Sequence, residues 1–147
     1  MKTIIIYAST HHGNTKKIVD CMAEQLAADT VDILQNPTPD ISAYDRIGFA
    51  SGVYFHSLHE KLKNYIECTT FQENQNVFVV ATCGVAYIDY TKSIKKLLKQ
   101  KNVSCIGSFQ CRGYDTYGIF GKIGGIAKHH PNEQDLKRAR EFAKTLI

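Results

Sequence analysis

The sequence contains no tryptophan, only three prolines and no C-x-x-C pair among its five cysteines. No apolar run approaches the ~20 residues that a helix needs to span a bilayer, so we expect no membrane span. The odd number and irregular spacing of the cysteines argue against a disulfide framework. They favour a reducing, cytoplasmic location in which the thiols fill core space. A chain of 147 residues predicts one domain covering residues 1–147.

The charge is mildly basic, with a formal net charge of +4 and a pI of about 8.8. Most basic residues in the second half stand opposite apolar helical positions, at 92, 95, 96, 99, 101, 137, 138, 140 and 144. This pattern is typical of solvated helix faces, and a docking surface for an acidic protein is the alternative. The chain has no basic run interleaved with aromatic residues, so nucleic acid is not an expected partner. Nothing in the sequence indicates an oligomeric state.

Apolar strands alternate with helical patterns along the chain. The expected strands are Thr3–Tyr7, Thr30–Leu34, Arg46–Ala50, Asn76–Thr82 and Val103–Gln110. Helices are expected over Asn14–Ala28, after a capping box formed by Ser57 and Glu60, around the apolar positions Tyr90, Ile94, Leu97 and Leu98, and after the cap Asn132. The uninterrupted run Val77–Ala81 indicates burial on both faces, as in a parallel sheet. The alternation predicts an α/β fold with a doubly wound five-stranded parallel sheet.

A hydroxyl-rich loop joins the first strand to the first helix. Helix N-termini present unpaired N–H groups and partial positive charge, so a loop at this position makes an anion site. Thr10, Asn14 and Thr15 add side-chain donors without adding formal charge. The sequence therefore predicts a phosphate-bearing ligand at the segment made of Ser9, Thr10, His11, His12, Gly13, Asn14 and Thr15.

The remaining reactive side chains do not form a recognisable site. His56 and His59 are three residues apart, but no cysteine or carboxylate spacing completes a metal-ligand set, and no metal is expected. Cys83 is interpreted as a small thiol that fills a loop, with redox sensitivity as the alternative. Cys105 and Cys111 are six residues apart, so both side chains should point to one face of an extended strand. At that separation along a strand the two thiols are too far apart to form a disulfide.

Two stretches resemble the flavodoxin family. Thr10–Thr15 matches the family's phosphate-loop pattern [S/T]-x-T-G-x-T, with His12 in place of the middle threonine. The C-terminal stretches Gly113–Gly118 and Gly124–Asn132 are also similar to segments of flavodoxin-family members. The resemblance covers essentially the whole chain and is strongest for the shorter flavodoxin-like proteins.

The resemblance implies a three-layer fold with strand order 2-1-3-4-5 and noncovalent FMN at the carboxyl ends of the strands, where the strand order reverses. Thr10–Thr15 would cradle the phosphate. Two further loops would flank the isoalloxazine ring of FMN. The first contains Ser51, Gly52, Val53, Tyr54 and Phe55, and the second contains Thr82, Cys83, Gly84, Val85, Ala86 and Tyr87. Gly52 is the candidate whose peptide reorients when the flavin gains a proton. Tyr114 and Tyr117 are further candidates for the rim.

The function that this resemblance implies is electron transfer between redox partner proteins through bound FMN, with no catalytic side chain. The basic chain departs from the acidic character usual in the family, which favours an acidic partner or a milder potential. The absence of tryptophan means that tyrosine or phenylalanine must stack on the ring. Two alternatives stay open: an FMN-dependent NAD(P)H:quinone-type reductase, and a flavin-free module that binds another phosphorylated ligand.

Overall fold

The computed structural model describes residues 1–10, 12–85, 87–114 and 124–147. The helices are α1 (Asn14–Leu26), α2 (Glu60–Cys68), α3 (Lys92–Gln100) and α5 (Glu133–Thr145). The strands are β1 (Thr3–Ala8), β2 (Asp29–Asp32), β3 (Arg46–Tyr54), β4 (Ser57–Leu58), β5 (Asn76–Cys83) and β6 (Ser104–Arg112). None of the described helices is both long and apolar enough to cross a membrane.

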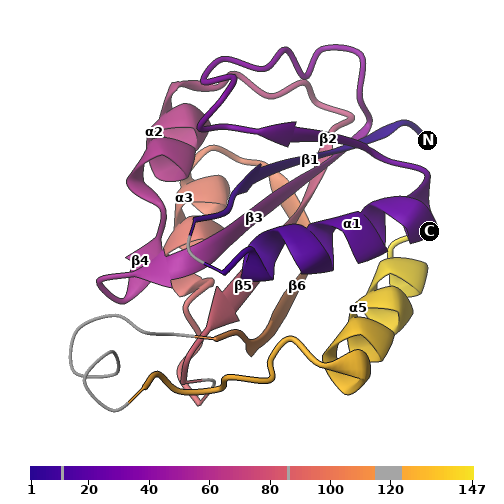
Figure 1. Cartoon of the computed structure of the whole chain (residues 1–147). Helices are drawn as coiled ribbons and strands as arrows, with labels where there is room; N and C mark the ends of the chain where they lie inside the picture. Colours follow the sequence, from indigo (N-terminus) through magenta and orange to yellow (C-terminus); the bar gives the residue numbers. More distant parts are fainter. Residues whose placement is uncertain (11, 86, 115–123) are drawn as a thin grey trace.

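The five long strands form a parallel sheet in the order β2-β1-β3-β5-β6. Counting these strands alone, the order is the expected 2-1-3-4-5, so the predicted fold is confirmed. Helices α1 and α5 cover one face of the sheet, and α2 and α3 cover the other (Figure 1). The three layers explain the uninterrupted apolar strands, since both faces of a central strand are buried.

The apolar run of β1 shows how the two core layers are filled. Ile4 and Ile6 join the core beneath α2 and α3, whereas Ile5 joins the core beneath α1 and α5. All three side chains are almost completely buried. Because side chains alternate along a strand, one isoleucine run supplies both layers.

The short additional strand β4 shows that the predicted start of α2 is wrong. Ser57 was expected to cap this helix with Glu60, but it lies in β4 and pairs antiparallel with Tyr54. His59 is the N-cap instead, and its Nδ1 accepts a hydrogen bond of 3.1 Å from the backbone N–H of Lys61. The hairpin turn places Phe55 and His56 at φ of 49° and 64°. Bulky residues rarely adopt this left-handed conformation, so these two residues carry no recognisable turn signal.

The cap of the last helix is confirmed. The Asn132 side chain accepts a hydrogen bond of 3.0 Å from the backbone N–H of Asp135. The Asp135 carboxylate accepts one of 2.9 Å from the backbone N–H of Asn132. This reciprocal pair is a capping box, which fixes where α5 begins.

A β-bulge in β6 overturns the expectation that Cys105 and Cys111 share a face. Cys105 pairs with Val77 and Gly107 pairs with Phe78, so Ile106 is an extra residue in the ladder. An extra residue reverses the facing of every later side chain. Cys105 therefore packs beside the core beneath α2 and α3, and Cys111 belongs to the core beneath α1 and α5.

Candidate functional site

A cavity opens where the carboxyl ends of β1, β3, β5 and β6 meet. Its lining residues are Thr10, Asn14, Thr15, Gly52, Val53, Tyr54, Phe55, Thr82, Cys83, Gly84, Gly113 and Tyr114. The position follows from the topology, because the strand order reverses beside β1 and leaves a crevice there. The cavity volume is about 80 Å³, below the roughly 300–1,000 Å³ of typical small-molecule sites. The Thr10 and Tyr54 hydroxyls, both in this lining, share a hydrogen bond.

The N-terminus of α1 borders this cavity, and its N-cap residue offers no side-chain acceptor. Its N-cap residue is Gly13, at φ 66°, and its first turn carries no acidic residue. His12 precedes it at φ 51°. A Cβ placed on Gly13 would meet no atom of the described residues within 4 Å, so these residues leave open space beside the turn. A helix N-terminus with open space and no protein carboxylate suits an anion.

Asn14 contributes a buried acceptor that no described residue satisfies. Its Nδ2 donates a hydrogen bond of 2.8 Å to the Tyr114 carbonyl, but its Oδ1 is buried without a partner among the described residues. A buried polar atom left unpaired costs about 1–3 kcal/mol. A ligand hydroxyl or N–H in the cavity would remove this cost.

Thr15 and Thr82 join the phosphate-loop region to β5. Their hydroxyl oxygens lie 2.8 Å apart in a buried hydrogen bond. One hydroxyl must donate to the other, so each retains hydrogen-bonding capacity toward the cavity that both line. The contact fixes the first turn of α1 against the carboxyl end of β5.

The end of β6 supplies two cavity residues that were not assigned to the phosphate or ring loops. The Gly113 N–H donates a hydrogen bond of 2.8 Å to the Cys83 carbonyl, and the Tyr114 N–H donates one of 2.9 Å to the His130 carbonyl. The rings of Tyr114 and His12 lie 4.1 Å apart. Tyr114 was only a candidate for the rim, and the available signal for Gly113 was its place in the family-like C-terminal stretch.

The structure brings most of the expected site residues to the cavity. Ten of them line it: Thr10, Asn14, Thr15, Gly52, Val53, Tyr54, Phe55, Thr82, Cys83 and Gly84. His12 and Gly13 form the turn before α1. His11, Ala86 and Tyr117 lie outside the described residues. The role of each residue toward a ligand stays a prediction.

Ser9, Ser51 and Tyr87 do not line the cavity. The Ser9 Oγ accepts a hydrogen bond of 3.2 Å from the Lys16 N–H in the first turn of α1. The Ser51 hydroxyl is fully buried, where it donates to the Gly52 carbonyl and accepts from the His59 N–H. Tyr87 is 86% exposed. Ser51 therefore stabilises the entry to α2, and Tyr87 projects into solvent.

The segment expected to be a loop after β3 is mostly strand. Gly52 pairs with Thr82 in the ladder between β3 and β5, and it is not among the residues with positive φ. Phe55 follows at the hairpin turn and is 81% exposed. Reorientation of the Gly52 peptide stays a prediction, and Phe55 offers an apolar surface at the cavity mouth.

The cysteines near the cavity are suited to packing. The Cys83 thiol donates to the Cys111 carbonyl at 3.4 Å. Burial, with the nearby Asp135 carboxylate as a smaller cause, raises the pKa of Cys111 to about 12. This thiol therefore stays protonated and weakly reactive at neutral pH. Within the described part of the chain, no three His, Cys, Asp or Glu side chains are grouped so as to hold a metal.

Comparisons with known proteins give one consistent family. A family model described as "Flavodoxin domain" matches residues 4–124. The chain is 41% identical over 150 residues to "Uncharacterized protein MJ0298" of Methanocaldococcus jannaschii, covering 100% of this chain and 99% of that protein.

Two solved structures show the same fold at low sequence identity. A flavodoxin from Streptococcus pneumonia TIGR4 aligns with a TM-score of 0.66 at 16% identity, covering 99% of this chain and 97% of the other. The azoreductase AzrA aligns with a TM-score of 0.68 at 10% identity, covering 99% and 98%. Because one is a flavodoxin and the other a reductase, these likenesses support the fold and leave the activity open.

Proposed function

The chain belongs to the flavodoxin domain family, and from this premise we propose that it binds FMN and carries electrons between redox partner proteins. The observation that supports FMN best is the pairing of two features in one cavity. The N-cap residue of α1, Gly13, provides no side-chain acceptor for the first turn, and the buried Asn14 Oδ1 has no partner among the described residues. The FMN phosphate would accept hydrogen bonds from the first turn of α1. A hydroxyl of the FMN side chain would donate a hydrogen bond to the Asn14 Oδ1.

The residues that would hold the cofactor follow from their positions. The first turn of α1, with Gly13, Asn14 and Thr15, would bind the phosphate through N–H and hydroxyl donors. The apolar surfaces of Val53, Tyr54 and Phe55 would cover the ring and exclude water. FMN supplies electron-transfer chemistry when bound, and the protein supplies position and electrostatics.

The electron-carrier proposal needs no reacting side chain, and the lining of the cavity agrees with this. In the described part of the cavity, the side chains are hydroxyls, one amide, one thiol and apolar groups, with no carboxylate or imidazole. Such a lining is suited to positioning a cofactor that itself carries the redox chemistry. The FMN-dependent NAD(P)H:quinone-type reductase stays the second candidate, because a reductase shares the fold.

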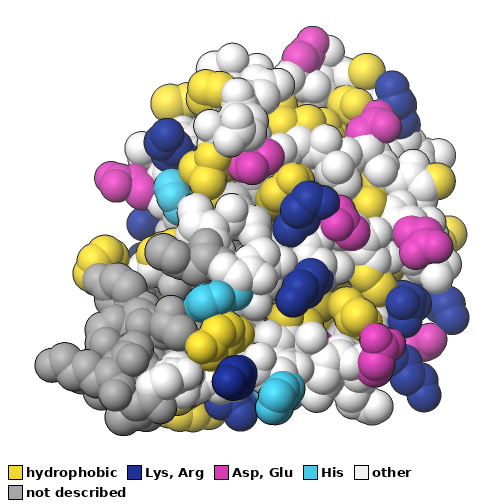
Figure 2. All heavy atoms as spheres, in the orientation of Figure 1, with side chains coloured by type: hydrophobic (Ala, Val, Ile, Leu, Met, Phe, Trp, Pro, Cys, Tyr) yellow, Lys and Arg dark blue, Asp and Glu magenta, His cyan; other side chains and the backbone are white. Residues whose placement is uncertain are grey.

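We expect at least one redox partner to be acidic. Figure 2 shows basic and acidic side chains interspersed over the α1 and α5 face, with ion pairs such as Lys16–Asp20 and Lys144–Glu141. The segment of α3 and β6 is different, because no acidic residue occurs between positions 90 and 112, while its cations are Lys92, Lys95, Lys96, Lys99, Lys101 and Arg112. Charge of one sign steers association with a partner of the other sign.

Direct oxidation of NAD(P)H tests the carrier against the reductase. FMN-loaded protein is expected to turn over NADH or NADPH with a quinone at less than about 0.1 per second, against the 1–1,000 per second usual for enzymes. The measurement is steady-state absorbance at 340 nm, with free FMN at the same concentration as the control. Turnover of about 1 per second or more without a partner protein would contradict the carrier proposal and support the reductase.

A further inference from the structure

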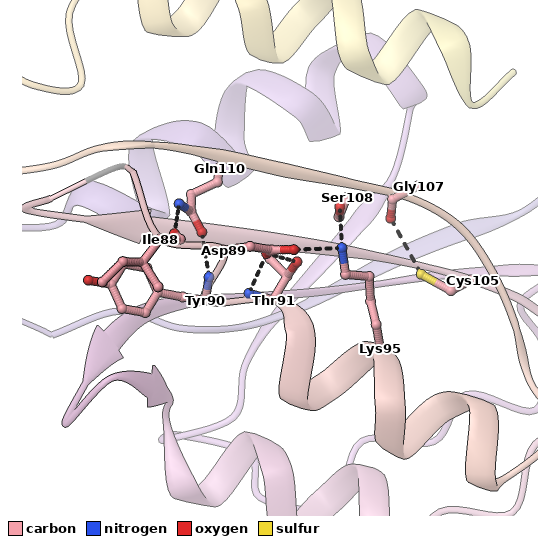
Figure 3. A network of polar contacts seen from close by, with 9 residues as sticks. All are labelled: Ile88, Asp89, Tyr90, Thr91, Lys95, Cys105, Gly107, Ser108 and Gln110. Carbon is pink, nitrogen blue, oxygen red and sulfur yellow. Dashed lines mark hydrogen bonds and ion pairs between the residues drawn. The ribbon is translucent and has the colours of Figure 1, made fainter.

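Two side chains of the edge strand β6, those of Gln110 and Arg112, contact the segment between β5 and α3, and a third, that of Ser108, contacts Lys95 of α3. We call this segment, residues 84–91, the β5–α3 loop; residue 86 lies outside the described residues. Ser108, Gln110 and Arg112 are two residues apart from one another, so they share one face of the strand. Figure 3 shows Gln110 and Lys95 of α3 joined to the loop, and Ser108 joined to Lys95.

Gln110 makes the closest contacts with the loop backbone. Its Nε2 donates a hydrogen bond of 2.6 Å to the Ile88 carbonyl, and its Oε1 accepts one of 3.0 Å from the Tyr90 N–H. One amide side chain thus satisfies an acceptor and a donor two residues apart, as a neighbouring β-strand would (Figure 3). The loop is held at its centre by a side chain.

Two further contacts hold the ends of the loop. The Arg112 Nε donates a hydrogen bond of 3.1 Å to the Gly84 carbonyl. At the other end, the Lys95 ammonium lies 3.3 Å from the Ser108 Oγ and 3.0 Å from the Asp89 carboxylate. Hydrogen bonds from Thr91 and the Lys95 charge keep the pKa of Asp89 below its usual value, so this ion pair persists at neutral pH.

The bulge at Ile106 determines which face carries these side chains. Beyond the bulge, Phe109 and Cys111 belong to the core beneath α1 and α5. The alternate residues therefore face α3 and the loop. Without the extra residue, Ser108, Gln110 and Arg112 would point to the opposite face of the sheet. The Cys105 thiol donates to the Gly107 carbonyl at 3.6 Å and so spans the bulge (Figure 3).

We propose that Gln110, aimed by the bulge at Ile106, is a positioning residue that sets the β5–α3 loop beside the ligand. The loop begins with Gly84, which lines the cavity next to Cys83. Gln110 does not line the cavity and acts through the loop backbone. The inference rests on the proposed function in one respect, that the ligand of the cavity is FMN.

The test compares Gln110→Met with Gln100→Met. Methionine keeps the length of glutamine and removes both hydrogen bonds, while Gln100 is an exposed residue at the end of α3. The first measurement is amide hydrogen exchange of Tyr90 in protein without ligand. We expect Gln110→Met to accelerate this exchange about tenfold and Gln100→Met to leave it unchanged. Gln110→Glu keeps the acceptor for the Tyr90 N–H but sets a second acceptor against the Ile88 carbonyl, so it is expected to restore only part of the protection.

The second measurement is the FMN dissociation constant and midpoint potential of the same variants. Gln110→Met is expected to weaken FMN binding about fivefold and to shift the potential, and Gln100→Met to change neither. Unchanged amide exchange at Tyr90 in Gln110→Met would show that the Gln110 side chain does not hold the loop. Faster exchange with unaltered FMN affinity and potential would show that the loop does not act on the site. Either result overturns the inference. If the parent protein protects Tyr90 yet binds no FMN, the proposed function fails, and the positioning role fails with it.

Discussion

Replacing Gly113 with alanine is expected to weaken FMN binding at least about tenfold, a loss of about 1.4 kcal/mol. A Cβ at this position would lie 2.6 Å from the Asn14 Nδ2 and 2.9 Å from the Asn14 Cβ. Rotation of the Asn14 side chain cannot relieve the second contact, so the end of β6 and the start of α1 must separate. The separation breaks the Asn14–Tyr114 hydrogen bond and moves residues on two sides of the cavity.

The measurement is quenching of FMN fluorescence during titration with protein. Gly107→Ala is the matched control, because it makes the same change earlier on β6, where the new Cβ would lie 3.1 Å from the Phe142 ring of α5. Its FMN affinity should stay within about twofold of the parent even if stability falls. Equal FMN affinity of Gly113→Ala and the parent protein would mean that the contact between Gly113 and Asn14 does not shape the site.

Replacing Gly48 with alanine is expected to lower the free energy of unfolding by about 2 kcal/mol. Gly48 pairs with Phe78 across β3 and β5, and a Cβ on Gly48 would lie 2.4 Å from the Phe78 ring. The ring is fully buried and also packs against Phe142, so it has no room to withdraw. Overpacking of this kind forces side chains or backbone out of their preferred positions.

Denaturant unfolding of the ligand-free protein measures this effect. Gly52→Ala on the same strand is the control and should change stability by less than about 0.5 kcal/mol, because its new Cβ would lie 3.4 Å from the nearest atom. The double variant Gly48→Ala/Phe78→Leu should lose less stability than the sum of the single variants, because a smaller side chain leaves room for the methyl group. Strict additivity would show that the ring is not the obstacle.

The fold could be predicted because its signals are local. The apolar runs of β1 and β5 and the cap at Asn132 each report on a few neighbouring residues, and the alternation of strands and helices predicts the sheet. Neither β4 nor the bulge at Ile106 has such a signal. The β4 turn uses Phe55 and His56 in a conformation that glycine or asparagine normally adopts. The bulge depends on how β6 pairs with β5, which no short window of sequence contains.

The site could be predicted at the phosphate loop and only in part elsewhere. Thr10, Asn14 and Thr15 share a short motif that precedes a helix, so their position follows from sequence. Ser51 is of a residue type common in ligand sites, but its hydroxyl accepts a hydrogen bond from the backbone N–H of His59, the N-cap of α2. Gly113 and Gln110 act through residues about 100 and 20 positions away, Asn14 and Tyr90. Contacts of that range depend on the assembled sheet.

A titration with FMN and with riboflavin tests the central claim, that the N-terminus of α1 binds the phosphate of a flavin. The two ligands share the ring and differ only in the phosphate. We predict one FMN per chain, with FMN bound at least about 100-fold more tightly than riboflavin, because each hydrogen bond to a charged group contributes about 1.5–3 kcal/mol. Equal affinity for the two flavins, or no binding of either one, would contradict this account.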